Sequence, residues 1–180
     1  MRTHIALLRG INVSGRNMIK MAELKRLFAE LGFEHVETLL QSGNVAFRAD
    51  GRGCADLEAL LARETAERLK VSVPYLVRTA AEWAEVIREN PFPAEALADP
   101  SHLLVLFMPS GVDAAEAEAV RAKIQGPERF AVRGRHMYVV YPDGIGNSTV
   151  GRTPGWNRLT LAGSARNWNT VLKLDAMLHS

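Results

Sequence analysis

The stretch IALLRGINVSGRN, Ile5–Asn17, organises the first half of the chain. Its four leading apolar residues, 5–8, predict a buried strand. The chain then turns polar and contains glycine, and apolar residues recur at three- and four-residue spacing over 20–31, which predicts a helix ended by Gly32. The polar loop between this strand and this helix is a common position for a ligand site, and equally for a plain connection.

The residues that follow continue the pattern of a small sheet covered by helices. Short apolar runs around the turn Gln41-Ser42-Gly43 predict a hairpin. The expected elements of this part are strands at 35–40 and 44–48, a helix at 54–70 and a strand at 71–77. The order strand, helix, strand, strand, helix, strand is ferredoxin-like, with an antiparallel sheet and both helices on one face.

The second half partly repeats this order. Thr79 and Glu82 match a capping box that opens a helix, and three prolines then indicate a linker over 90–101. Further along we expect strands at 102–108, 129–132 and 137–141, helices at 114–124, capped by Asp113, and at about 165–178, and an aperiodic glycine-rich stretch at 142–155. The fold class is therefore α+β, with a ferredoxin-like βαββαβ first half and a second, partial ferredoxin-like half with a C-terminal helix. The expected division is 1–79, 80–101 and 102–180.

Composition narrows the classes of function. The chain has 180 residues, of which 47% are hydrophobic and 23% charged, as in an ordinary soluble globular protein. No apolar run is long enough to cross a bilayer and no signal peptide is evident, so we expect a cytoplasmic protein. The single cysteine, Cys54, rules out an intramolecular disulfide, and the five histidines lack metal-ligand spacing, so no metal site is expected.

Positive charge is concentrated at the two ends of the sequence. Residues 1–26 hold six Arg or Lys against one Asp or Glu, and residues 133–180 hold six against two. The middle of the chain is acidic, although the total is only +2. If the two ends meet in the fold, they form a basic face that attracts anions. The alternative is that these charges are simply scattered over the surface.

Two polar segments of the first half are candidates for ligand contact. The loop after the first strand offers positive charge and amide groups before a helix N-terminus, where an anion is stabilised. The hairpin turn lies beside it if the first and third strands pair. The alternative is that the glycines only make turns and the arginines pair with carboxylates. The candidate residues are Arg9, Asn12, Arg16, Asn17, Lys20, Gln41, Ser42 and Asn44.

Two further candidates lie in the second half. Ser164 is expected to cap the last helix, which would place Arg166 and Asn167 in its first turn and Asn169 close behind. A cation there opposes the helix dipole, so either an anionic ligand or, more commonly, a carboxylate of the protein should compensate it. The stretch Gly144–Thr149 has the composition of a phosphate-binding loop but lacks the strand and helix that would identify one.

The blocks ALLRGINV, GRN, QSGNV and RNWNTV resemble an uncharacterised bacterial family, the domain-of-unknown-function family numbered sixteen ninety-seven. The resemblance spans nearly the whole chain. It implies an α+β fold built from ferredoxin-like pieces, and no established activity, substrate or cofactor. The family's blocks coincide with the candidate segments at 9–20, 41–44 and 166–169.

These patterns favour binding over general acid–base chemistry, because the candidate residues are donors and acceptors with little carboxylate or histidine. We expect a small phosphate-bearing or nucleotide-like anion at a polar basic site between the two halves. A nucleic-acid binder is the first alternative, with Phe47 and Tyr75 as the main aromatic residues for stacking. A structural protein whose polar cluster joins the two halves is the second. Catalysis, a cofactor and the oligomeric state stay open.

Overall fold

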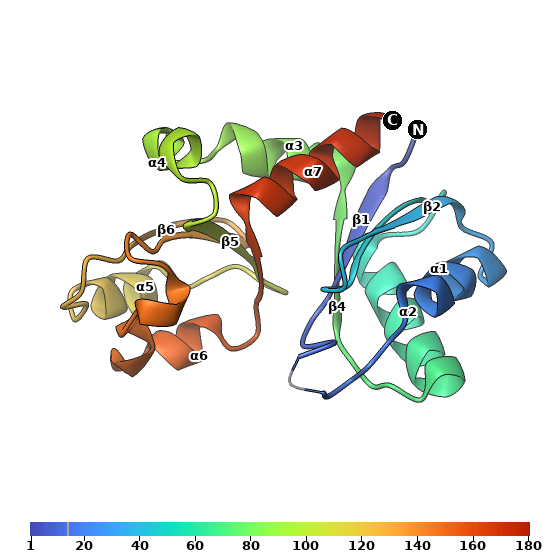
Figure 1. The fold of residues 1–180 in the computed structure, drawn as a ribbon, viewed down its shortest axis with the longest axis horizontal. Coiled ribbons are helices and arrows are strands. Elements are labelled where there is room, and N and C mark those ends of the chain that lie inside the picture. The colour runs from blue at the N-terminus through green and yellow to red at the C-terminus, as the bar shows by residue number, and fades with distance from the viewer. Residues whose placement is uncertain (14) are drawn as a thin grey trace. The chain divides into compact units, whose positions relative to one another are not determined.

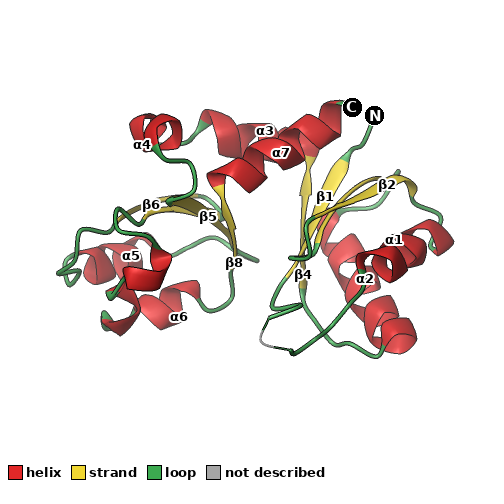
Figure 2. Ribbon diagram, viewed as in Figure 1, coloured by secondary structure: helices red, strands yellow, loops and turns green. Residues whose placement is uncertain are grey.

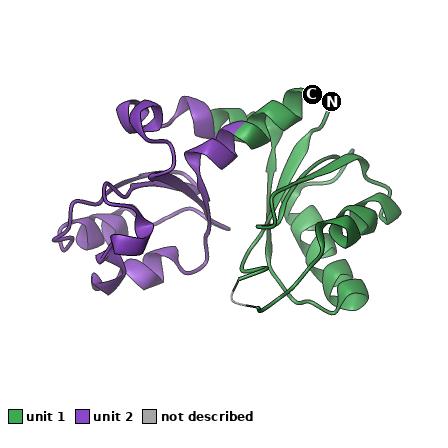
Figure 3. Ribbon diagram, in the orientation of Figure 1, with its two compact units in different colours: residues 1–85, 173–180 green, residues 86–172 purple. Residues whose placement is uncertain are grey.

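The computed structural model describes residues 1–13 and 15–180 (Figure 1). Helices and antiparallel strands both occur, so the α+β class is confirmed (Figure 2). The chain separates into two compact units: unit 1 is Met1–Glu85 with Lys173–Ser180, and unit 2 is Val86–Leu172 (Figure 3). The division into 1–79, 80–101 and 102–180 stays a prediction.

Unit 1 has the expected ferredoxin-like order. Its four strands form one antiparallel sheet in the order β2-β3-β1-β4. The last strand begins later than expected, because Pro74 has no backbone N–H to give to a ladder. The elements are β1 (His4–Leu8), α1 (Met21–Glu30), β2 (Glu34–Leu39), β3 (Asn44–Arg48), α2 (Cys54–Leu69) and β4 (Tyr75–Thr79).

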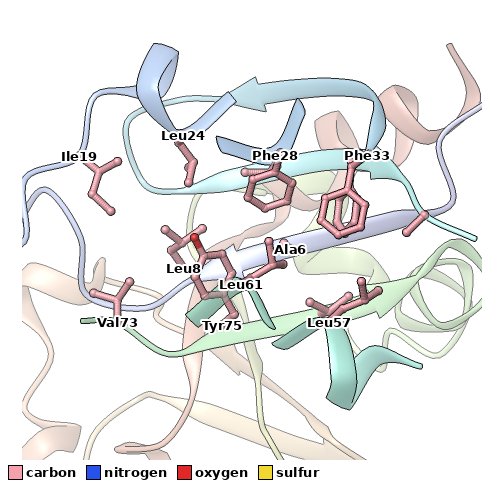
Figure 4. Packing of buried hydrophobic residues seen from close by; sticks show 14 of the residues in the cluster. Ala6, Leu8, Ile19, Leu24, Phe28, Phe33, Leu57, Leu61, Val73 and Tyr75 are labelled. Atoms are coloured by element: carbon pink, nitrogen blue, oxygen red, sulfur yellow. The ribbon is translucent and has the colours of Figure 1, made fainter. Parts of the chain in front are cut away.

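The core of unit 1 lies between the sheet and both helices (Figure 4). The ring of Phe28 from α1 meets that of Phe47 from β3 edge-on, with centroids 5.1 Å apart. Leu57 and Leu61 supply the contribution of α2, and each is fully buried. Alternate strand residues, such as Ala6 and Leu8, point to the same layer, as the two-residue period of a strand requires.

Local signals at helix ends are confirmed. The backbone N–H of Thr79 donates to Glu82 Oε2 at 2.9 Å, and the N–H of Glu82 donates to Thr79 Oγ1 at 3.1 Å, which is the reciprocal capping box. It opens α3 (Ala80–Arg88). Asp113 Oδ1 likewise accepts from the N–H of Glu116 at 2.7 Å at the start of α5 (Ala114–Arg121). Gly32 follows α1 with φ +84°, as a C-terminal cap requires.

Unit 2 repeats the topology of unit 1. Its sheet has the order β6-β7-β5-β8, again antiparallel throughout. Its core is built from the sheet, α5 and α6. The remaining elements of the chain are α4 (Pro93–Ala98), β5 (Leu103–Phe107), β6 (Arg129–Arg133), β7 (His136–Val140), the 3₁₀ turns η1 (Ile145–Asn147) and η2 (Val150–Arg152), α6 (Trp156–Thr160), β8 (Ser164–Asn167) and α7 (Trp168–His179).

The prediction for 164–167 is wrong. These residues are a strand, not the first turn of the last helix, because they pair with β5 from Leu104↔Asn167 to Phe107↔Ser164. Helix α7 starts at Trp168, so Ser164 does not cap it and Arg166 does not oppose its dipole. The expected linker at 90–101 also contains α4, which begins at Pro93, a position where proline is well tolerated.

No helix within residues 1–13 and 15–180 is both long and apolar enough to span a bilayer.

Candidate functional site

The loop that joins β1 to α1 is anchored where β1 ends. The N–H of Leu8 donates to the carbonyl of Gly43 at 2.8 Å, and the N–H of Arg9 donates to the carbonyl of Pro74 at 3.1 Å. The end of β1 is therefore held from both neighbouring strands. As the antiparallel pairing predicted, the start of β3 lies beside it, with Leu7 opposite Asn44.

Asn12 closes this loop. Its side-chain Nδ2 donates to the carbonyls of Ile19, at 3.0 Å, and Gln41, at 2.7 Å, while its Oδ1 accepts from the N–H of Ile19 at 2.9 Å. The amide thus bonds to both backbone groups of Ile19 and ties the loop to the β2–β3 hairpin through Gln41. This use of both ends of the amide makes Asn12 a structural clamp beside the candidate site.

Two more asparagines brace the same region. Asn17 Nδ2 donates to the carbonyl of Gly10 at 3.0 Å. Asn44, which is fully buried, donates to the carbonyl of Leu39 at 2.8 Å and to Ser42 Oγ at 2.9 Å. The sequence singled out these amides as ligand contacts, and the structure places each of them against the protein itself.

The backbone here is unusually rich in left-handed residues. Asn12 and Asn17 have φ of 52° and 49°, and Leu40 in the hairpin has φ 59°. Asparagine tolerates this region, but a leucine there is strained and is 54% exposed. Strain of this kind persists only where the surrounding structure imposes it, and it is concentrated at functional sites.

The cations of the loop differ in their surroundings. Arg16 and Lys20 are exposed, and neither makes an ion pair with a residue in the described part of the chain. Arg9 is half-buried. Segments 9–20 and 40–44 contain no aspartate or glutamate. Lys20 is also the N-cap of α1 and gives its first turn no side-chain hydrogen bond, so a positively charged surface adjoins the positive end of a helix.

The candidates from the second half of the sequence lie in unit 2. Arg166 is 8% exposed, and its Nη1 donates to Ser164 Oγ at 2.8 Å and to the carbonyl of Ala165 at 2.7 Å. Burial lowers the pKa of Arg166 to about 10. Asn167 Oδ1 accepts from the N–H of Thr170 at 3.0 Å and so caps α7, whereas Asn169 is exposed.

The structure also contains features without a clear sequence signal. Unit 2 has a hollow of about 480 Å³ lined by a buried carboxylate, that of Glu128. A second, polar hollow of about 320 Å³ includes Thr149, the last residue of the glycine-containing stretch noted in the sequence, together with Lys123 and Arg152. Glu128 follows Gly126-Pro127, a sequence that indicates only a turn. No metal-binding group of His, Cys, Asp or Glu occurs among the residues described.

Comparison with known proteins gives a family. Residues 1–138 match the family model described as "Protein of unknown function (DUF1697)". The chain belongs to this family. No curated protein matches it. A similar solved structure is that of the conserved bacterial protein SP0830 from Streptococcus pneumoniae, to which the chain is 21% identical, with a TM-score of 0.74, over 100% of this chain and 99% of that chain. At this identity the likeness concerns the fold alone.

Proposed function

We propose that this DUF1697 protein binds a small phosphate-bearing anion at the loop between β1 and α1. The observation that carries the proposal is the pair of exposed cations, Arg16 and Lys20, in a segment without carboxylates. Arg9 and the hydroxyl of Ser42, on the adjoining hairpin, complete the set of donors. Their chemistry suits phosphate oxygens, which accept hydrogen bonds and carry negative charge.

The hydrogen bonds of Asn12 and Asn17 support this proposal. A ligand pays less to bind a loop that is already ordered than one it must order itself. Asn12 and Asn17, which lie on either side of Arg16 in the sequence, each donate side-chain hydrogen bonds to backbone carbonyls of unit 1. We therefore assign these asparagines a positioning role and the cations the direct contact. Participation of Arg166, Asn167 and Asn169 in the same site stays a prediction.

A nucleic-acid partner is the less favoured alternative. Phe47 and Tyr75, the aromatic residues expected on the strands, are 0% and 3% exposed and belong to the core of unit 1. Neither ring is available to stack on a base. An anion recognised through its phosphate is the simpler partner for a site of cations and hydroxyls.

The test is calorimetric titration of pyrophosphate and of ATP into the wild-type protein and the double variant Arg16→Ala/Lys20→Ala. We expect binding to the wild type and a loss of roughly tenfold or more in affinity in the variant, since each charge-assisted contact is worth about 1.5–3 kcal/mol. Arg52→Ala is the matched control. It removes an exposed arginine from the segment between β3 and α2, at the opposite end of the same sheet, and should bind like the wild type.

Two outcomes would count against the proposal. The proposal is wrong if neither pyrophosphate nor ATP binds the wild-type protein. An equal loss per removed charge in the double variant, which removes two charges, and in Arg52→Ala, which removes one, would show attraction to net charge rather than a site. Adding Arg166→Ala to the series tests separately whether the buried arginine of unit 2 takes part.

A further inference from the structure

The hollow of about 480 Å³ in unit 2 lies beside the edge strand β6, between it, the end of α5 and the segment before α4. Its volume is within the range of small-molecule sites. The half-buried Phe92 and Ile124 supply apolar surface, and Phe130, which also lines the hollow, is buried. It belongs wholly to unit 2, so nothing in it depends on the anion site proposed for unit 1.

Glu128, which lines this hollow, has an unsatisfied acceptor. The residue is 7% exposed, and its Oε1 accepts a hydrogen bond from the hydroxyl of Ser148. Its Oε2 is buried and has no hydrogen-bond partner among the residues described. A buried carboxylate oxygen without a donor is costly, and such groups in native proteins call for an explanation, often a ligand or ion.

The cations that line the hollow do not neutralise Glu128. Arg121 pairs with Glu118, and Arg129 pairs with Glu95. Within the described part of the chain, Glu128 makes no ion pair. Both arginines are thus paired with carboxylates that lie outside the lining of the hollow, and the carboxylate of Glu128 is left without a paired cation.

Each of these arginines also lies over an aromatic ring. The guanidinium carbon of Arg121 is 4.8 Å from the ring centroid of Phe130, and that of Arg129 is 5.5 Å from that of Phe92. The stacks hold flat groups at the wall of the hollow, and a flat ligand can lie against them. The hollow thus has planar side chains in its wall as well as the carboxylate of Glu128.

The backbone makes room for the carboxylate at Gly126. A Cβ at this position would lie 2.0 Å from Glu128 Oε2, so any larger residue would displace that oxygen. Since φ of Gly126 is not in the left-handed region, space and not backbone conformation is the reason that a glycine fits here.

We propose that this hollow is a binding site for a small aromatic amine, with the ammonium group donating to Glu128 and the ring lying against Phe92 and Ile124. The amine supplies both the missing donor and the compensating charge. The apolar surface takes the ring. A carboxylate ligand of the same shape is repelled by Glu128.

The test uses two probes that share a phenyl ring and a two-carbon chain and differ in charge, phenethylamine and 3-phenylpropionate. Each is titrated into the ¹⁵N-labelled protein and followed by the amide shifts of residues 90, 92, 121–126 and 128–131. We expect phenethylamine to shift these amides and 3-phenylpropionate not to do so. Glu128→Gln should weaken phenethylamine about tenfold or more, as the loss of a charge-assisted hydrogen bond predicts.

Glu118→Gln is the matched control, because it removes a carboxylate next to Arg121 that does not line the hollow. It should leave the phenethylamine affinity unchanged. Phe92→Ala leaves the carboxylate in place and should also weaken binding of phenethylamine. It is the variant to use if Glu128→Gln does not fold. No binding of phenethylamine to the wild type, or the same affinity in the wild type and Glu128→Gln, overturns the proposal.

Discussion

The side-chain amide of Asn12 donates to the carbonyl oxygen of Gln41 at 2.7 Å, across 29 residues of sequence. This bond joins the loop after β1 to the hairpin between β2 and β3. Both segments were expected to carry ligand-binding residues, and a single asparagine holds them together. The stability of unit 1 and the shape of its candidate site are therefore linked through Asn12.

Asn12→Asp should destabilise the protein by about 1–3 kcal/mol, because the aspartate loses both donors and sets an oxygen against the carbonyls of Ile19 and Gln41. Urea unfolding followed by circular dichroism measures this loss. Asn12→Gly keeps the left-handed backbone and removes all the side-chain bonds. If Asn12→Gly is as stable as the wild type, the clamp contributes nothing.

Gly43→Ala should be more damaging than an alanine at another left-handed glycine. A Cβ at Gly43 would lie 2.7 Å from both Leu8 Cβ and Ile11 Cδ1, whereas a Cβ at Gly51, which has φ +72°, would meet nothing within 4 Å. Both variants incur the backbone cost of about 1–2 kcal/mol, and only Gly43→Ala adds a core clash of about 1–3 kcal/mol. If Gly43→Ala and Gly51→Ala lose the same stability in thermal or urea unfolding, the core around residue 43 accommodates the added methyl group without cost.

Asn167→Ala should cost about 0.5–2 kcal/mol, because it removes the acceptor that caps α7. Asn169→Ala, two residues on and exposed, should change stability little. Asn167→Asp retains the acceptor and should restore most of the loss. The comparison is made by differential scanning calorimetry, and a full loss in Asn167→Asp would argue against the capping role.

His4 should make stability fall on mild acidification. Burial lowers its pKa below the ordinary 6.5, and the opposing influence of Glu82 and Asp50 is smaller. Between the two values the unfolded chain holds the extra proton, so the unfolding free energy decreases as pH drops below about 6.5, by at most about 1.4 kcal/mol per pH unit. Urea unfolding from pH 7.5 to 5 should show a shallower slope for His4→Gln. If the unfolding free energy falls with pH equally in the wild type and in His4→Gln, His4 is not the cause of the fall.

The order of elements in unit 1 could be predicted because each buried strand or helix carries its own apolar pattern. The residues of β1, β3 and α2 are buried at the spacing that the sequence displays. Helix ends were also readable where a side chain acts on its own neighbours, as with Thr79 and Glu82. Such signals can be read from the sequence because both partners lie within a few residues of each other.

Strand β8 shows what could not be predicted. Ser-Ala-Arg-Asn is short and polar, and it becomes a strand only because β5, which lies far earlier in the chain, offers an open edge. Tertiary pairing here overrides local preference. The hydrogen bonds within the candidate site could not be predicted for a similar reason. The sequence shows that Asn12, Asn17 and Asn44 carry amide donors and acceptors, but it does not show that their amides donate to carbonyls of the same unit.

Unit 1 is discontinuous, since 173–180 follow all of unit 2 in the chain. Arg2 Nη1 donates to the carbonyl of Met177 at 2.7 Å, so Arg2 has a partner that is made only after unit 2 has been synthesised. Residues 1–85 must spend the whole of that interval without their closing segment. The native contacts of unit 1 can therefore be completed only after the whole of unit 2 has been translated.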